Sequence, residues 1–363
     1  MANKTARLGD LATYINGYAF KPADWGETGL PIIRIQDLTG NSYQLNRYDG
    51  EYPERIEVND GDVLISWSAS LGVYVWQRGK ALLNQHIFRV VFDKLPVNKD
   101  YFVFAVEHKL AEMESKTHGA TMKHIVKKDF DGTTIPYPPI EKQAEIADHL
   151  RRITSLIDRQ TEQLLLLDQL VKSRFIELFG DPLSNDKGWK KVVIAEVCHT
   201  IFGGGTPSKS HPEYFAGSIP WVSPKDMKSS VINDSIDHIT EEAIAHSTTN
   251  LVPANSVLMV IRSGILKHSL PVAINSLPVT INQDMKAFVP NETVKTAFLM
   301  HFFKAIENDV LAGVRGVTAD NIDFKAFQKR TIIVPPLALQ EQFAAFVEQT
   351  DKSKLCSKME VAA

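Results

Sequence analysis

The chain contains one segment twice: IPYPPIEKQAEIADHL at residues 135–150 returns as IIVPPLALQEQFAAFV at residues 332–347. In both copies a short apolar run ends in two prolines, and Gln143 and Gln340 stand at the same place after them. Apolar residues then recur three or four positions apart, which is the period of an amphipathic helix. Proline is favoured at a helix start, because the first amides have no partner within the helix. Each segment therefore predicts a strand that ends just before a long helix.

Upstream of each predicted helix, further stretches of the chain also occur twice. They match in the same order and at similar spacing: PIIRIQDL (31–38) with IPWVSPKDM (219–227), DVLIS (62–66) with SVLMV (256–260), LNQHIFRV (83–90) with INQDMKAF (281–288), and YFVFAVEHKL (101–110) with FLMHFFKAI (298–306). Self-similarity of this kind is the sequence signature of a repeated architecture. We expect two copies of one fold.

Each copy is predicted to be an α+β unit. DVLISWS (62–68) and LGVYVW (71–76) in the first copy, and SVLMVIRS (256–263) in the second, have the alternating or fully apolar character of strands. A helix and a further strand follow before the double proline. We therefore expect globular units at residues 1–138 and 183–335, with helical segments at 139–182 and 336–363, related as a pseudo-two-fold internal repeat.

The first of these helices carries an apolar stripe over about 40 residues, or about 60 Å at 1.5 Å per residue. Gly180 and Pro182 mark its end. The stripe consists of Ile146, Leu150, Ile153, Ile157, Leu164, Leu167, Val171, Phe175 and Leu178. This length exceeds that of an ordinary core helix and favours a coiled coil. The second helix has little more than half that length before Ala363, so we expect it to pair with only part of the first.

Composition narrows the classes of function. The chain has 363 residues, 44% of them hydrophobic, which fits two folded domains. The formal net charge of −3 gives no overall attraction to nucleic acid, so DNA binding would need local basic patches or a helper subunit. The two cysteines, Cys198 and Cys356, form no zinc motif. With no apolar signal region and no membrane-spanning stretch, we expect a cytoplasmic protein without a metal site.

The loop FGGGTPSKS (202–210) resembles a phosphate-binding loop only at first sight. A P-loop needs glycine directly before its Lys-Ser pair, whereas Ser208 stands there. Pro207 removes an amide donor, and prolines at 212 and 220 interrupt the helix that should follow. We therefore expect no ATP site in this loop.

Taken together, these features resemble the specificity subunit of type I restriction-modification enzymes, over nearly the whole chain. The resemblance rests on the duplicated PPIEKQAEI (138–146) and PPLALQEQF (335–343), on GGGTPS (203–208) at the opening of the second unit, and on FIELFGDP (175–182) at the end of the first long helix. It implies that each unit is a target recognition domain that reads one half of a split DNA sequence. It also implies that the helices form an antiparallel coiled coil that sets the separation of the half-sites.

The resemblance further implies a non-catalytic subunit without a cofactor of its own. Its partners would be double-stranded DNA, two methyltransferase subunits and, through them, motor-nuclease subunits, with no membrane involved. S-adenosylmethionine, ATP and Mg²⁺ would belong to those partner subunits. The sequence agrees, because it has no Asn-Pro-Pro-Tyr or Asp-Pro-Pro-Tyr methylation motif and no P-loop. We expect no catalytic residues in this chain.

Basic and hydroxyl residues beside glycine turns are candidates for contacts with DNA phosphates. The loop of the second unit offers Thr206, Ser208 and Lys209. Between its helix and its final strand, each unit also has a basic turn; these turns offer Lys116, His118, Lys123 and His124 in the first unit, and Arg315 and Thr318 in the second. The common alternative for such residues is a solvated surface.

Residues that differ at matching positions are the better candidates for base contacts, because the two halves would read different sequences. These residues are Arg34, Gln36, Ser66 and Ser68 in the first unit, and Lys225, Arg262 and Lys267 in the second. Asn84-Gln85 and Asn282-Gln283 could read adenine through their amides. Since both copies share them, we expect scaffold bonds or sequence-neutral contacts instead.

Two other functions remain open at this point. A duplicated adaptor, whose coiled coil joins two protein partners, fits the near-neutral charge, although the paired basic turns argue against it. An enzyme that binds nucleotide at FGGGTPSKS fits less well, for the reasons given above.

Overall fold

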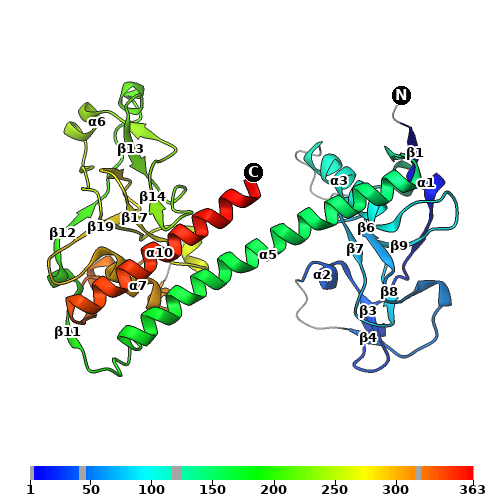
Figure 1. The fold of residues 1–363 in the computed structure, drawn as a ribbon, viewed down its shortest axis with the longest axis horizontal. Coiled ribbons are helices and arrows are strands. Elements are labelled where there is room, and N and C mark those ends of the chain that lie inside the picture. The colour runs from blue at the N-terminus through cyan, green and yellow to red at the C-terminus, as the bar shows by residue number, and fades with distance from the viewer. Residues whose placement is uncertain (1–3, 41–45, 117–124, 315–319, 363) are drawn as a thin grey trace. The chain divides into compact units, whose positions relative to one another are not determined.

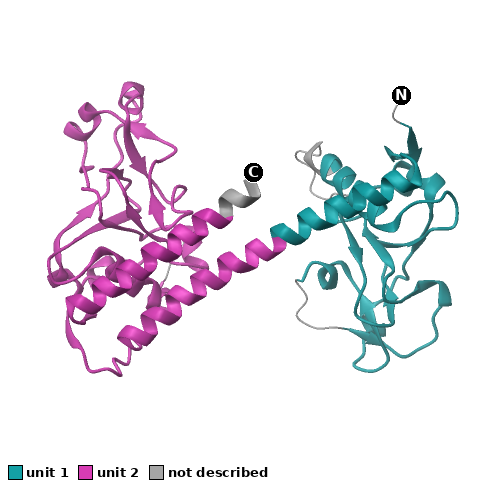
Figure 2. Ribbon diagram, viewed as in Figure 1, with its two compact units in different colours: residues 1–157 teal, residues 158–363 magenta. Residues whose placement is uncertain are grey.

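The computed structural model describes residues 4–40, 46–116, 125–314 and 320–362, apart from the side chains of 114–116 and 358–362. The chain folds into two compact units, unit 1 (residues 1–157) and unit 2 (residues 158–363) (Figure 2). Helix α5 (Ile140–Phe179) begins in unit 1 and ends in unit 2. Its 40 residues confirm the predicted long helix.

Unit 1 contains two four-stranded sheets and a separate two-stranded sheet. One sheet has the order β2-β9-β6-β7 and is antiparallel, whereas the other, β4-β3-β8-β5, contains the parallel pair β3 and β8. β1 pairs with β10, and α3 lies against β7. The elements are β1 (Thr5–Arg7), α1 (Leu8–Leu11), β2 (Thr13–Asn16), η1 (Pro22–Asp24), β3 (Leu30–Ile33), α2 (Ile35–Leu38), β4 (Arg47–Tyr48), η2 (Glu54–Ile56), β5 (Glu57–Val58), β6 (Val63–Ser66), β7 (Gly72–Val75), β8 (Ala81–Leu83), β9 (Ile87–Val91), α3 (Lys99–Lys116), α4 (Lys127–Gly132) and β10 (Thr134–Pro136).

Unit 2 repeats this architecture (Figure 1). Its sheets are β12-β19-β16-β17-β14 and β15-β13-β18, and β11 pairs with β20. The elements are β11 (Lys190–Val193), η3 (Ile194–Val197), β12 (Cys198–Gly203), η4 (Pro212–Phe215), β13 (Ile219–Val222), β14 (Val231–Ile232), β15 (His238–Ile239), α6 (Glu241–Ala245), β16 (Val257–Val260), η5 (Gly264–Lys267), β17 (Val272–Asn275), β18 (Thr280–Ile281), β19 (Met285–Pro290), α7 (Thr296–Ala305), α8 (Glu307–Ala312), α9 (Phe324–Phe327), β20 (Thr331–Val334) and α10 (Leu337–Ala362).

The internal repeat predicted from sequence is confirmed strand by strand. The order β2-β9-β6-β7 returns as β12-β19-β16-β17, and the parallel pair β3 and β8 returns as β13 and β18. The central strands β6 and β16 are buried along their whole length. Strands buried on both faces read as continuous apolar runs, which is why VLIS and VLMV match so clearly in the sequence.

The repeated glutamines explain how each long helix is attached to its unit. Gln143 is fully buried; its side-chain oxygen accepts from the Asn98 amide at 3.0 Å, and its nitrogen donates to the Pro138 carbonyl at 2.8 Å. Gln340 does the same in unit 2, accepting from the Lys295 amide at 2.8 Å and donating to the Pro335 carbonyl at 2.8 Å. Each glutamine therefore joins the double proline to the residue that precedes α3 or α7.

In unit 2, α10 packs antiparallel to the last part of α5 (Figure 1). The Phe343 ring lies 5.5 Å from those of Phe175 and Phe179, whereas further along α10 the ammonium of Lys354 lies 2.7 Å from the carboxylate of Asp168. Val171, Phe175 and Phe179 belong to the core of unit 2. The predicted antiparallel helix pair is thus present over the final turns of α5. The stripe residues Leu150, Ile153 and Ile157, by contrast, are exposed.

Candidate nucleic-acid interface

The glycine-rich loop of unit 2 packs against the end of β18 and against Asn282, the residue that follows it. A Cβ atom on Gly204 would lie 1.7 Å from the Asn282 carbonyl oxygen, so only glycine allows this approach. The Gly205 amide donates to the Ile281 carbonyl at 3.0 Å, and the indole of Trp221 donates to the Gly205 carbonyl at 3.0 Å. The glycines thus serve close packing of backbone on backbone. The Thr206 hydroxyl, just beyond them, donates to the side-chain oxygen of Gln283.

Unit 1 makes the same close approach with a different sequence. A Cβ atom on Gly17 would lie 2.0 Å from the Asn84 carbonyl oxygen, and the Tyr18 amide donates to the Leu83 carbonyl at 2.8 Å. NGYAFKP (16–22) is therefore the counterpart of GGGTPSKS, a match that the sequence comparison missed. The only signal was a single shared glycine before a short polar stretch. Asn84 and Asn282 occupy the same place in this scaffold, as their repetition suggested.

A hollow of about 630 Å³ opens beside the unit 2 loop. Lys209 of the loop and Lys225 after β13 supply its positive charges, and both side chains are exposed. The rest of the lining comes from Pro212, Phe215, Trp221, Ser223, Pro224, Asp237, Asn282 and Asp284. The structure thus brings together two cations that lie 16 residues apart in sequence, next to hydrogen-bonding groups and aromatic rings. Such a surface suits phosphates and base edges.

Arg262 is attached to this hollow through Asp284. Its Nε donates to Asp284 Oδ1 at 2.5 Å, and its Nη2 lies 2.5 Å from the same oxygen. The Arg262 amide also donates to the Asp284 carbonyl at 3.2 Å, so both backbone and side chain are tied to Asp284. The Arg262 side chain nevertheless remains 49% exposed, against 22% for Asp284. One edge of the guanidinium is thereby fixed while the other stays accessible.

Comparison with known protein families identifies two domains of one family in this chain. The family model for the type I restriction modification DNA specificity domain matches residues 2–167 and again residues 186–359. The chain belongs to this family. Both specificity domains contain the close glycine approach described above.

Curated relatives of the chain are specificity subunits of type I restriction enzymes. The chain is 36% identical over 222 residues to the EcoR124I/EcoR124II specificity subunit of Escherichia coli, a match that covers 60% of this chain and 53% of that protein. It is 29% identical over 168 residues to the EcoBI specificity subunit of Escherichia coli, covering 46% and 35%. The chain therefore matches about half or less of the length of these relatives.

Solved structures share the fold. The S subunit of a type I restriction-modification system from M. genitalium superposes with a TM-score of 0.61 at 14% identity, covering 99% of this chain and 92% of that one. A second structure, from work on complex assembly and conformational transition of the type I R-M system, superposes with a TM-score of 0.55 at 17% identity and covers 99% of this chain and 92% of that one.

The base-reading residues predicted for the first specificity domain differ in accessibility. Gln36 is exposed and Ser68 is half-buried. The Arg34 guanidinium pairs with buried Asp37 at 3.1 Å and lies over the Trp25 ring at 5.7 Å, and the Arg34 side chain is only 11% exposed. Ser66 is fully buried at the end of β6, where its hydroxyl donates to the Ser70 carbonyl at 2.5 Å. Ser66 is therefore not accessible at the protein surface, because β6 is an inner strand whose four residues are all buried.

The second specificity domain presents most of its predicted residues at the surface. Thr206, Ser208, Lys209 and Lys225 are exposed, with Ser208 bonded to the Ser210 hydroxyl at 2.7 Å. Lys267, in the short helix η5, is exposed and lies 3.9 Å from the Asp320 carboxylate. The remaining candidates fall outside the described residues or side chains: Lys116, His118, Lys123, His124, Arg315 and Thr318.

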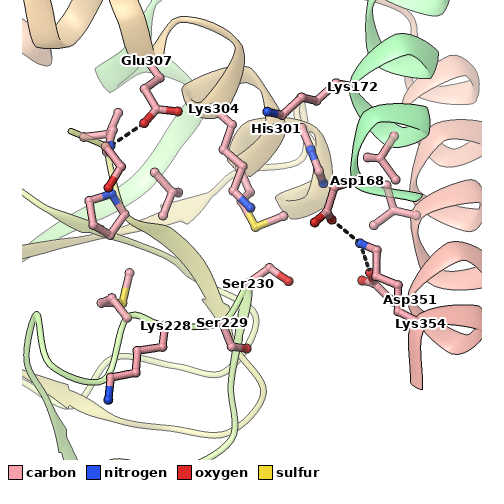
Figure 3. A pocket seen from close by; sticks show the side chains of 18 residues that line it. Asp168, Lys172, Lys228, Ser229, Ser230, His301, Lys304, Glu307, Asp351 and Lys354 are labelled. Carbon is pink, nitrogen blue, oxygen red and sulfur yellow. Dashed lines mark hydrogen bonds and ion pairs between the residues drawn. The ribbon is translucent and has the colours of Figure 1, made fainter. Parts of the chain in front are cut away.

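A separate cavity of about 340 Å³ lies within unit 2, between α5, α7 and α10 (Figure 3). Lys354 lies there between the carboxylates of Asp168 and Asp351, at 2.7 and 3.0 Å, and fastens α10 to α5 (Figure 3). Burial lowers the pKa of His301 to about 3, and it also lowers the pKa of Lys304. These groups belong to the junction of the helices rather than to the hollow beside the loop.

Two further features bear on what the specificity domains could bind. In the part of the chain that the structure describes, no group of three or more His, Cys, Asp or Glu side chains could hold a metal ion. No described helix is long and apolar enough to cross a bilayer.

Proposed function

We propose that the chain is the DNA-reading subunit of a type I restriction-modification complex, with each specificity domain reading one half of a split DNA target. One observation carries this proposal: a single scaffold occurs twice, and its framework is repeated while its accessible side chains differ. Gly17 and Gly204 make the same backbone contact. Ser68 and Arg262, which stand at equivalent positions, differ completely in size and charge.

The hollow of unit 2 supports direct contact with DNA. Lys209 and Lys225 are exposed cations that line it, and each phosphate that a lysine neutralises releases a condensed counterion and favours binding. The loop has no P-loop glycine, and only the short 3-10 helix η4 follows it, so nucleotide binding has no support there. Local basic groups of this kind can act despite the net charge of −3.

The helices support a second role, the docking of partner subunits. Leu165, Leu166 and Leu170 of α5 are 59%, 55% and 49% exposed, which is unusual for three neighbouring leucines on one helix. We propose that methyltransferase subunits, two per chain, bind the helical segments and recruit motor-nuclease subunits in turn. The chain itself would do no chemistry; S-adenosylmethionine, ATP and Mg²⁺ would act in the partners. As a reader of chromosomal DNA, the protein would work in the cytoplasm.

Co-expression with methyltransferase subunits tests the proposal. Genomic DNA from those cells is sequenced for methylated adenine, and cells that express the methyltransferase subunits alone serve as the control. We expect methylation in one bipartite motif, two short half-sites separated by a fixed gap, that depends on this chain. Methylation without this chain, or a motif with no internal gap, would contradict the proposal.

A further inference from the structure

The guanidinium of Arg262 is held in a way that leaves two donors in one plane for a ligand. On one edge of the guanidinium, Nε donates to Asp284 Oδ1 at 2.5 Å and Nη2 lies 2.5 Å from the same oxygen. A guanidinium has five N–H donors in a planar fork, so the opposite edge still offers the hydrogens of Nη1 and the second hydrogen of Nη2. The side chain is 49% exposed. The outer edge is therefore a rigid pair of parallel donors.

Asp284 is itself held in place. Its carboxylate accepts from the side-chain nitrogen (Nδ2) of Asn282 at 3.3 Å, and its backbone amide donates to Asn282 Oδ1 at 3.1 Å. Asn282 is buried, and its own backbone amide donates to the Val222 carbonyl at 2.9 Å. The chain of contacts runs from the scaffold through Asn282 and Asp284 to Arg262. Because the Arg262 side chain is already ordered before DNA binds, less conformational entropy is lost on binding, and a base contact becomes tighter and more selective.

Equivalent backbone contacts show which residues replace this pair in unit 1. The Ile261 amide donates to the Asp284 carbonyl at 2.8 Å, just as the Trp67 amide donates to the His86 carbonyl at 3.2 Å. Asp284 therefore corresponds to His86, and Arg262, the next residue after Ile261, corresponds to Ser68. Both members of the pair change between units while the scaffold asparagine stays the same. A device that differs in this way is suited to specificity rather than to folding.

We infer that Arg262, positioned by Asp284, reads a guanine in the half-site of unit 2. Guanine presents two adjacent acceptors, O6 and N7, in the major groove, and the planar double donor of arginine matches them. Adenine offers only one acceptor there beside a donor, and the pyrimidines offer at most one. Lys209 and Lys225 line the same hollow as Asp284, so their charges are available to neighbouring phosphates. This inference rests on the proposed function, because it requires that unit 2 binds duplex DNA.

The test uses the complex of the full chain with methyltransferase subunits and a pool of duplexes with randomised half-sites. The wild-type complex is expected to enrich a bipartite motif with a guanine in one half-site. Arg262→Ala and Arg262→Lys are expected to reduce the preference for that guanine by about 5- to 150-fold, with the other positions unchanged. Lysine keeps the charge but not the planar pair of donors, so a loss in Arg262→Lys separates guanine reading from general attraction.

Asp284→Asn tests the positioning role. It keeps the size of the side chain but weakens its hold on Arg262, so the same guanine and no other position is expected to lose preference. A merely structural residue would weaken all positions together. Arg330→Ala is the matched control, because Arg330 pairs with Asp309 elsewhere in unit 2; its motif should equal that of the wild type.

The outcomes separate this inference from the proposed function. If the wild-type complex enriches no bipartite motif, the proposed function and the inference both fail. If it enriches such a motif but Arg262→Ala keeps every guanine preference, the guanine contact alone is overturned. A loss spread over both half-sites in Arg262→Ala would overturn it as well.

Discussion

Replacing Gln340 by leucine should cost unit 2 much more stability than its position at the start of a helix suggests. Gln340 is fully buried, accepts from the Lys295 amide at 2.8 Å, and donates to the Pro335 carbonyl at 2.8 Å and the Thr293 carbonyl at 3.2 Å. Leucine fills a similar volume but leaves these groups without the amide partner. A buried polar group without a partner costs about 1–3 kcal/mol. With two well-aligned bonds lost, the free energy of unfolding should fall by about 2–6 kcal/mol.

The assay is urea unfolding of the full chain, followed by tryptophan fluorescence. Taking about 2 kcal/mol per molar urea for the dependence on denaturant, the midpoint of unit 2 should fall by about 1–3 M. Gln342→Leu is the matched control on the same helix, because Gln342 is exposed and a surface change usually costs within about 0.5 kcal/mol. Gln143→Leu should weaken unit 1 in the same way. If Gln340→Leu cost no more than Gln342→Leu, the attachment described here would be wrong.

Further substitutions test the close glycine contact, the buried histidine and the two lysines of the hollow. Gly204→Ala would place a Cβ atom 1.7 Å from the Asn282 carbonyl oxygen, so it should lower stability in thermal unfolding by about 1–3 kcal/mol or more and weaken the preference for one half-site. In Gly264→Ala the Cβ atom would meet nothing within 4 Å, so this control should change neither the stability nor the half-site preference. Burial lowers the pKa of His301 from 6.5 to about 3, so the unfolded chain takes up this proton first as the pH falls. This group should therefore remove about 1 kcal/mol of stability between about pH 7.5 and 5.5, and His301→Gln should lose that part of the pH dependence in urea titrations. Lys209→Ala and Lys225→Ala should each weaken DNA binding of the complex and reduce the slope of log K against log salt by about 1, without changing the motif; an unchanged slope would remove that lysine from the phosphate contacts.

Much of the architecture could be predicted from sequence because it depends on local periodicity. The 40-residue helix follows from an unbroken apolar stripe between Pro139 and Gly180, and the repeat of the sheets follows from apolar runs such as VLIS and VLMV that recur in order. Such signals survive divergence, since burial constrains residue type at every buried position.

The details of the interface depend on contacts between distant segments, and these were less predictable. The sequence places Ser66 among the residues that contact DNA, but it lies in β6, between β9 and β7, where all four residues are buried. The position of a strand within its sheet depends on distant partners, which the sequence alone does not give. The sequence places Arg34 among the base-reading residues, but it does not show that the guanidinium pairs with Asp37. The ion pair between Arg262 and Asp284 spans 22 residues and joins the segment after β16 to the segment before β19, so it could be recognised only from the fold.

The central claim, that the two units read separate half-sites, is tested most directly by exchanging one of them. Residues 1–138 are replaced by the corresponding domain of a relative that reads a different half-site, and the hybrid is co-expressed with methyltransferase subunits. Methylated adenines are then mapped by sequencing. We predict that one half of the motif changes to that of the donor, whereas the other half and the gap between them stay the same. A change in both halves, or a changed gap with an intact α5, would contradict the account.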